Sequence, residues 1–192
     1  MYDPDLWKAP ELKSASQFSW LLADINEELS RRELRGDIYL VGEAAMLFPY
    51  DARPRGLDCV EAILAPRSEL LEIAEIVTAG TFLEDDWLRD SPRKLSDIQC
   101  RALIPIVQYD YLTVWHPGDR RMVAIKFLEA FRSEEAAHDA MFPMGRMGIS
   151  SKEDLLAIVS ESFPEWRATQ MHDYLARVLL ERMHKNEEPP SH

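Results

Sequence analysis

A short β-forming segment that ends in a glycine and passes straight into an apolar helical segment limits most strongly what this chain can fold into. Residues 37–41 have the composition of a strand, which Gly42 ends. Residues 44–48 follow at once and have the composition of a small buried helix that stops before Pro49. Strand, turn and helix therefore follow one another without a spacer. This order predicts a mixed α/β core.

The segments on either side continue the alternation. Between Ser14 and Gly36, apolar residues recur at helical spacing after a Ser-x-x-Gln capping pattern. After a turn rich in Arg, Pro and Gly, residues 58–64 have strand character, and residues 68–79 carry apolar side chains at helical spacing up to Gly80. We therefore expect one amphipathic helix followed by a β-α-β-α core.

Two further strands are expected in the middle of the chain. Residues 84–90 resemble a short acidic helix or turn, whereas residues 101–107 and 109–115 have strand character. Pro105 cannot donate a ladder hydrogen bond, so it confines the first of these strands to a sheet edge or a bulge. Asp110 then lies at the beginning of the second strand.

The chain after Pro117 is predicted to be helical. The four expected helices cover residues 121–131, 134–147, 152–162 and 166–184. Gly148 is the expected stop of the second helix, and Ser151 belongs to a capping pattern before the third. The predicted fold class is thus α+β. Residues 1–117 form a mixed sheet flanked by helices, residues 118–185 form a helical extension, and residues 186–192 form a disordered tail.

The charge balance limits the partners that we expect. Lys and Arg number 22 against 34 Asp and Glu, which gives a formal net charge of −12 and argues against binding to duplex DNA. Arg53, Arg55 and Arg67 form the most basic neighbourhood, which would attract a nucleotide, a tRNA end or an acidic protein segment, unless they are solvated loop arginines. No apolar run is long enough to span a membrane and the N-terminus lacks a secretory pattern, so we expect a cytoplasmic protein without membrane contact.

Several short motifs occur in a defined order between residues 37 and 164. They are Val41-Gly42-Glu43-Ala44-Ala45-Met46, Ala52-Arg53, Asp58, Trp87-Leu88, Leu112-Thr113-Val114, Pro117, Ala124-Ile125-Lys126, His138-Asp139 and Gly148-Ile149-Ser150. In order and spacing this set resembles a family of bacterial nucleotidyltransferase-like proteins related to the toxins of abortive-infection toxin–antitoxin systems. The resemblance implies a nucleotidyltransferase-like sheet and transfer of a nucleoside monophosphate from a nucleoside triphosphate to a hydroxyl of RNA or protein.

The resemblance also assigns roles to individual residues. Gly42 and Glu43 occupy the turn that faces the triphosphate, and Asp58 and Asp110 are the candidate catalytic carboxylates and Mg²⁺ ligands. The remaining candidate nucleotide-binding residues are Arg53, Arg55 and Lys126. Simpler alternatives stay open. Asp58 could cap a turn or pair with an arginine, Asp110 could be a surface residue at the start of a strand, and Lys126 could lie on a helix surface or pair with Glu43.

Two positions depart from the family pattern. Members usually carry Gly-Gly or Gly-Ser in the first motif and Asp-x-Asp in the second, whereas this chain has Glu43 after Gly42 and Val60 two residues after Asp58. A carboxylate ~4 Å from a phosphate charge contributes about 4 kcal/mol of repulsion at an effective dielectric constant near 20. Glu61 alternates to the face opposite Val60, so it replaces the missing carboxylate only if the strand is bulged.

These departures lead to three hypotheses. The first is a nucleotidyltransferase-fold pseudoenzyme, a regulatory or binding subunit in a bacterial defence or toxin–antitoxin setting. The second is an active Mg²⁺-dependent nucleotidyltransferase with an unusual metal cage built from Asp58, Glu43 or Glu61, and Asp110. The third is a structural protein that forms a homo-oligomer or a complex with a protein partner. Loss of nucleoside triphosphate binding in an Asp58→Ala variant would favour the second.

Overall fold

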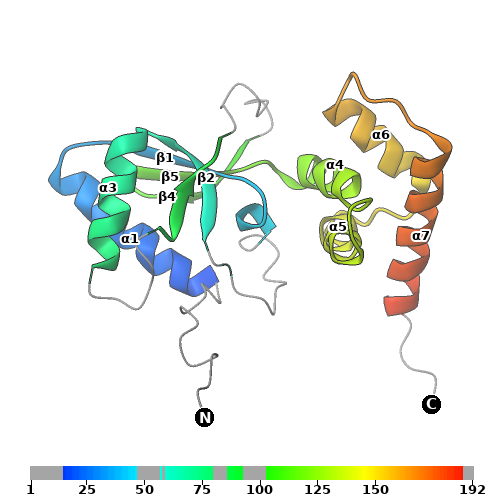
Figure 1. The fold of residues 1–192 in the computed structure, drawn as a ribbon, viewed down its shortest axis with the longest axis horizontal. Coiled ribbons are helices and arrows are strands. Elements are labelled where there is room, and N and C mark those ends of the chain that lie inside the picture. The colour runs from blue at the N-terminus through cyan, green and yellow to red at the C-terminus, as the bar shows by residue number, and fades with distance from the viewer. Residues whose placement is uncertain (1–14, 47–56, 58, 80–85, 93–102, 188–192) are drawn as a thin grey trace, which may run out of the picture. The chain divides into compact units, whose positions relative to one another are not determined.

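The protein is described by a computed structural model, and the description covers residues 15–46, 57, 59–79, 86–92 and 103–187 (Figure 1). The chain divides into two compact units, Met1–Pro117 and Gly118–His192. This division falls at the residue where the sequence pattern changes from mixed to helical. Each unit is described by itself below.

The first unit is built on one mixed sheet of five strands in the order β3-β2-β1-β5-β4. The strands are β1 (Gly36–Leu40), β2 (Val60–Ala65), β3 (Leu88–Asp90), β4 (Ile104–Gln108) and β5 (Leu112–His116). β1 lies at the centre, antiparallel to β2 and parallel to β5. The predicted α+β class is therefore confirmed at the level of a mixed sheet with helices.

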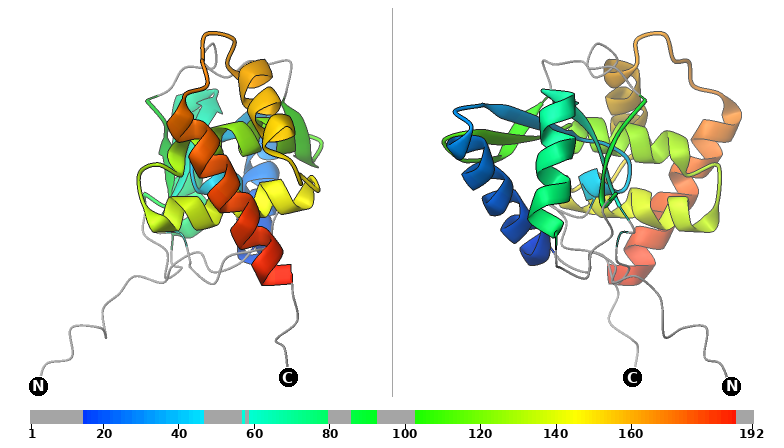
Figure 2. Two further views of the ribbon diagram at one scale, coloured as in Figure 1. Left: turned by 90° about the vertical axis from the view of Figure 1, so that its right-hand side faces the viewer. Right: turned by 60° about the vertical axis from the view of Figure 1, so that its left-hand side comes forward.

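Two helices cover one face of this sheet. α1 (Ala15–Arg31) packs against α3 (Arg67–Thr78) and β5, while α3 also contacts β2 and β3 (Figure 2). Two helices that touch each other lie on the same side of a sheet. The core between them and the sheet contains fully buried side chains that the helical spacing of α1 predicted, namely Phe18, Leu22, Ile25 and Leu29.

The two edges of the sheet test the strand predictions. β4 is an edge strand, and its register with β5 shifts between Pro105 and Val107, so the expected edge position and bulge are both confirmed. At the other edge, the predicted acidic helix or turn over residues 84–90 is present as a turn at Asp86 and Trp87, but it is wrong for the last three residues. Residues Leu88–Asp90 form β3, parallel to β2, because Trp87 is buried and its carbonyl accepts a hydrogen bond from Val60 N–H at 2.6 Å.

The second unit contains α4 (Asp119–Glu129), α5 (Glu134–Arg146), α6 (Lys152–Ser162) and α7 (Gln170–Glu187). α4 packs against α5 and α6, and α7 lies across α5 and α6 (Figure 2). α6 has the predicted bounds, and Ser151 caps it by accepting a hydrogen bond from Asp154 N–H at 3.1 Å. Gly148, with a φ of 64°, follows α5 as expected. Met144 is fully buried in this unit's core.

α7 begins four residues later than predicted. Trp166, the predicted first residue, lies in a turn in which its N–H donates to Phe163 O at 2.9 Å, and the helix begins at Gln170 after Thr169. The apolar spacing that indicated an earlier start reflects burial of Trp166 against the helices, because this side chain packs on the unit's core from outside α7. Among the described helices, none is long and apolar enough to cross a bilayer.

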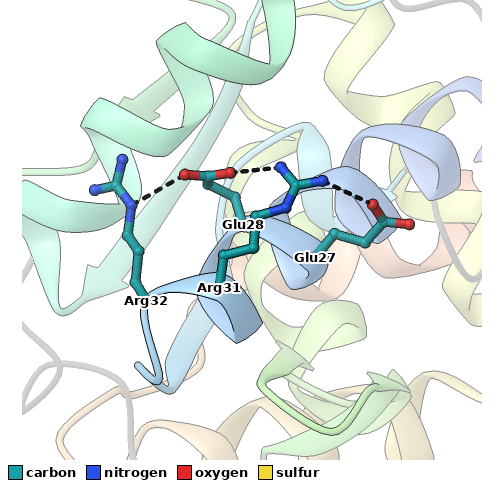
Figure 3. A network of polar contacts seen from close by, with 4 residues as sticks. All are labelled: Glu27, Glu28, Arg31 and Arg32. Carbon is teal, nitrogen blue, oxygen red and sulfur yellow. Dashed lines mark hydrogen bonds and ion pairs between the residues drawn. The ribbon is translucent and has the colours of Figure 1, made fainter.

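A small network of ion pairs closes the end of α1 (Figure 3). Glu28 accepts hydrogen bonds from Arg31 at 2.8 Å and from Arg32 at 3.2 Å, and Arg32 also reaches Glu72 of α3 at 3.1 Å. These hydrogen bonds hold the pKa of Glu28 below its ordinary value of 4.5. The network therefore links α1 to α3 at the helix surface.

A Glu28→Gln variant is expected to show a small loss of thermal stability at pH 7. The folded pKa of Glu28 lies below the unfolded one, so the carboxylate stabilises the fold above pH 4.5 and this contribution disappears as the pH falls through the folded pKa. Thermal melts of both proteins from pH 7 to pH 3 should therefore converge at the acidic end. Glu27→Gln is the matched control, because Glu27 is more exposed and, among the described residues, is paired with Arg31 at 3.4 Å. Equal melting-temperature differences at every pH would contradict this role.

Candidate functional site

The turn after β1 forms the centre of the candidate site. Gly42 has a φ of 57°, a left-handed backbone conformation that favours glycine. The chain then makes a helical turn in which Met46 N–H donates to Glu43 O at 2.9 Å, and Ala44, Ala45 and Met46 are buried. The predicted passage from strand through glycine to a helical turn is thus present. Glu43 itself is exposed.

A carboxylate from the neighbouring strand lies at this turn. β2 runs antiparallel to β1 with Leu40 opposite Ala62, and Val41 N–H donates to Glu61 O at 3.2 Å. Glu61 Oε2 lies 3.6 Å from the position that a Cβ atom on Gly42 would occupy. Ser91, which follows β3, donates from its hydroxyl to Glu61 Oε1 at 2.7 Å. The Glu61 carboxylate is therefore held beside the glycine turn by a buried hydroxyl.

The two faces of β2 decide which residues belong to this site. Val60 and Ala62 are fully buried, so their face of the strand belongs to the core. Glu61 and, by period-two alternation, Cys59 belong to the other face. Glu61 thus lies on the face opposite Val60, as predicted, but the expectation that it reaches the site only through a bulge is wrong, because it lies beside Gly42 in the regular register. The expectation assumed that the strand face shared by Asp58 and Val60 faces the site. Val60 is fully buried, so its face of the strand packs into the core instead.

Three of the predicted site residues, Asp58, Arg53 and Arg55, lie outside the described residues. Their assignment to the site stays a prediction. Cys59, which follows Asp58 in the chain, is half-buried and leads into β2 at the end where Gly42 lies.

The topology separates Asp110 from this turn. Asp110 is exposed in the connection between β4 and β5, where Tyr109 N–H donates to Leu112 O at 2.8 Å. β5 runs parallel to β1 with Leu112 opposite Gly36, so Asp110 lies at the end where β1 begins. β1 alone spans about 13 Å at ~3.3 Å per residue. This separation contradicts the assignment of Asp110 to one metal site with the Gly42 turn.

His116 is a residue of this end of the sheet that the sequence did not single out. It is the last residue of β5. Because β5 runs parallel to β1, the carboxyl ends of the two strands lie at the same end of the sheet. Its side chain is buried, and Nε2 lies 2.9 Å from Ala45 O. His116 thus fastens the helical turn that follows Gly42. The sequence did contain a signal for this residue. Leu112 and Val114 alternate onto the core face of β5, and the same alternation places His116 on that face.

Lys126 belongs to the second unit and has acidic neighbours there. Its side chain is buried on α4, with Nζ 2.9 Å from Glu129 and 4.0 Å from Asp139 of α5. The helix-surface alternative for Lys126 is therefore wrong. These carboxylates therefore pair the lysine within the helical unit, and its assignment to nucleotide binding stays a prediction.

A shallow pocket of about 300 Å³ lies between α3 and the edge strand β3. Its walls include two guanidinium groups, but each already has an acidic partner. Arg67 Nε lies 2.6 Å from Asp90, and Arg89 Nε lies 3.0 Å from Asp86. Because Glu75 also lines the pocket, a bound anion would meet a net negative wall. We therefore place the candidate site at the Gly42 turn.

The donor set of that site is poor in metal ligands. Within the described residues, no group of three or more His, Cys, Asp or Glu side chains could hold a metal ion. Glu61 and exposed Glu43 are the carboxylates that the described residues place at the turn, and a Cys59 thiolate is a soft ligand that suits Mg²⁺ badly. No protein-family model matches this chain, and neither a curated protein nor a solved structure is significantly similar to it.

Proposed function

We propose that this protein is a nucleotidyltransferase-like binding protein that has lost, or greatly weakened, the transfer reaction. One observation carries the proposal: among the described residues, the face of β2 that meets the Gly42 turn bears Cys59 and Glu61, which is one carboxylate where the transfer chemistry needs two. The glycine turn after the central strand and the neighbouring antiparallel strand support the nucleotidyltransferase-like fold.

The reaction explains why a second carboxylate matters. In nucleotidyl transfer a hydroxyl attacks the α-phosphorus of a nucleoside triphosphate, and pyrophosphate leaves. The hydroxyl gives up its proton to a base or to water, and negative charge gathers on the attacking and leaving oxygens; Mg²⁺ held by carboxylates would neutralise this charge. Carboxylates that hold Mg²⁺ in this way share one face of a strand. Among the described residues the turn carries the carboxylates of Glu61 and of exposed Glu43, and both repel a triphosphate unless a cation binds them.

A regulatory or binding role in a bacterial defence or toxin–antitoxin setting fits this arrangement best. Loss of a carboxylate ends phosphate transfer but leaves the sheet and its covering helices intact, so the fold remains available for binding a partner. The net charge of −12 favours a basic protein partner over nucleic acid.

The proposal predicts that nucleotide binding can be restored by design. Wild-type protein is expected to show no Mg²⁺-dependent binding of any of the four nucleoside triphosphates at about 1 mM in calorimetry. The double variant Glu43→Ser, Cys59→Asp removes the repelling carboxylate and adds a second carboxylate to the strand face that carries Glu61. We therefore expect this variant to bind at least about tenfold more tightly than wild type, which corresponds to ~1.4 kcal/mol.

Glu61→Gln is the matched control, because it keeps the shape of the side chain and removes its charge. Added to the double variant, it should abolish the gained binding. The opposite result would be tight, Mg²⁺-dependent binding of a nucleoside triphosphate by the wild-type protein that Glu61→Gln abolishes. This result would refute the proposal that the transfer site has been lost.

That last outcome would support the second candidate function, an active nucleotidyltransferase with a rearranged metal cage. The hydrogen bond from Ser91 to Glu61 favours this alternative, because a carboxylate that a buried hydroxyl orients beside the glycine turn is suited to hold a cation. Release of pyrophosphate from a nucleoside triphosphate in the presence of RNA or protein acceptors would distinguish an enzyme from a protein that only binds.

A further inference from the structure

The first turn of α7 is closed by a reciprocal pair of hydrogen bonds in which a histidine takes part. Thr169 is the N-cap residue, since its carbonyl accepts the first helical bond from Asp173 N–H at 3.1 Å. His172 N–H approaches Thr169 Oγ1 at 3.5 Å, and Thr169 N–H donates to His172 Nδ1 at 3.0 Å. This is the pattern of a capping box, with histidine at the position that glutamate or glutamine usually occupies.

The capping box depends on the protonation state of His172. A backbone N–H needs a lone pair on Nδ1, which the neutral imidazole offers and the imidazolium does not, because both of its nitrogens carry hydrogen. Thr169 Oγ1 lies 2.7 Å from the same nitrogen and could accept a hydrogen bond from a protonated Nδ1. The backbone N–H of Thr169 is therefore the group that loses its acceptor when His172 gains a proton.

Aromatic side chains surround this histidine. The ring of His172 lies 5.0 Å from that of Phe131, 4.9 Å from that of Trp166 and 6.2 Å from that of Phe127. Trp166 Nε1 is buried and has no hydrogen-bond acceptor in the part of the chain that the structure describes. The contact with His172 thus helps to hold an indole whose own polar atom contributes no hydrogen bond there.

The link between α6 and α7, residues 163–169, makes stabilising contacts at both of its ends. At its start, Arg121 of α4 donates to Ser162 O and lies 4.1 Å from the ring centroid of Phe163, and burial lowers the pKa of this guanidinium. At its end, the capping box holds Thr169. Of these two contacts, the second contains an imidazole, a type of side chain whose charge is sensitive to pH.

The charged groups around His172 do not replace this interaction. α4 presents the rings of Phe127 and Phe131 to the imidazole. On its own helix, Asp173 lies 3.9 Å from Lys152 of α6, and in the link Arg167 donates to the carbonyls of Pro164 and Trp166. From α5, Glu134 pairs with Arg182, which lies further along α7. None of these charged groups contacts the imidazole among the described residues.

We propose that His172 makes the start of α7 a pH-sensitive latch. Neutral His172 closes the capping box and holds the link with Trp166 against α4. Protonation opens the box, frays the first turn of α7 and frees Trp166 together with the half-exposed Phe131. The latch belongs to the second unit and does not depend on the function proposed for the Gly42 turn.

Nuclear magnetic resonance on the full chain between about pH 7.5 and 5.5, the range in which a histidine titrates, tests this latch. In wild type, the exchange protection of the Thr169 amide, corrected for the intrinsic pH dependence of exchange, should fall about three- to tenfold as His172 titrates. The Trp166 indole signal should shift with the same midpoint. The control is His172→Gln, whose amide oxygen accepts the same N–H at every pH, so both signals should stay constant.

Two outcomes would overturn the proposal. One is an equal loss of Thr169 protection in wild type and His172→Gln. The other is read from wild type alone, by long-range correlation of the imidazole nitrogens: a proton on Nδ1 at the alkaline end of the titration is incompatible with the capping box. This second measurement decides the question even if the variant folds poorly.

Discussion

A Val60→Asp variant is expected to lose most of the stability of the first unit, by about 4 kcal/mol or more. Val60 is fully buried on the core face of β2, and an aspartate there has to remain charged without a partner or take up a proton. Since domains are stable by roughly 5–15 kcal/mol, such a loss leaves the unit close to unfolding. Urea unfolding followed by tryptophan fluorescence measures the effect as a fall in the transition midpoint.

The neighbouring substitution Cys59→Asp provides the control. It introduces the same carboxylate one residue earlier, on the half-buried face shared with Glu61, so we expect a change in stability within about 1 kcal/mol. The pair of variants therefore reads out the orientation of β2 directly. If Val60→Asp were as stable as wild type and bound Mg²⁺, Val60 would face the site, and the assignment of Glu61 to the Gly42 turn would be refuted.

The orientation of β2 is the part of the site that the sequence could not supply. Four of the six residues of Val60–Ala65 are buried, including Ile63 on the face of Glu61, so apolar alternation does not distinguish the two faces. Pairing decides the matter, because the antiparallel register with β1 brings Glu61 to Gly42. The Asp-x-Asp pattern was therefore sought at Asp58 and Val60, but Val60 lies on the core face of the strand.

Asp110 was misplaced for a related reason. The alternating aromatic residues from Tyr109 onward have the period of a strand, but the hydrogen bond from Tyr109 N–H to Leu112 O closes a turn, and β5 begins only at Leu112. The sequence also does not show that β5 runs parallel to β1, and this direction puts Asp110 at the far end of the sheet. The alternation of side chains along a segment predicts a strand. Which end of that strand reaches a site depends on how it pairs with strands from distant parts of the chain.

Features with a strong local cause were predicted correctly. The apolar spacing of α1 and α3, the cap of α6 by Ser151 and the edge position imposed by Pro105 depend on residues within one element or next to it. β3 is the counterexample. It is a three-residue strand whose pairing depends on the burial of Trp87, and its acidic surroundings gave no strand signal.

Trp87 is also the residue whose truncation should have the second large effect, a loss of about 3–5 kcal/mol for Trp87→Ala. Its side chain is 1% exposed, and its ring meets that of Phe18 of α1 edge-on at 6.0 Å. Its Nε1 donates to Ala74 O of α3 at 3.2 Å, and its own carbonyl accepts from Val60 N–H. One residue thus joins both covering helices to the edge of the sheet.

Two further variants separate the contributions of Trp87. Trp87→Phe keeps a ring against Phe18 and removes the indole N–H. Because Ala74 O also accepts from Thr78 Oγ1 at 2.9 Å, this carbonyl stays satisfied, and we expect a loss of only about 1–2 kcal/mol. Trp20→Ala is the surface control, since Trp20 is 76% exposed and should change the free energy of unfolding by less than about 0.5 kcal/mol. Urea midpoints that fall in the order Trp20→Ala, Trp87→Phe, Trp87→Ala would establish Trp87 as the residue that unites the helical layer with β3. Equal effects of Trp87→Ala and Trp20→Ala would contradict its buried position and, with it, the pairing of β3 with β2.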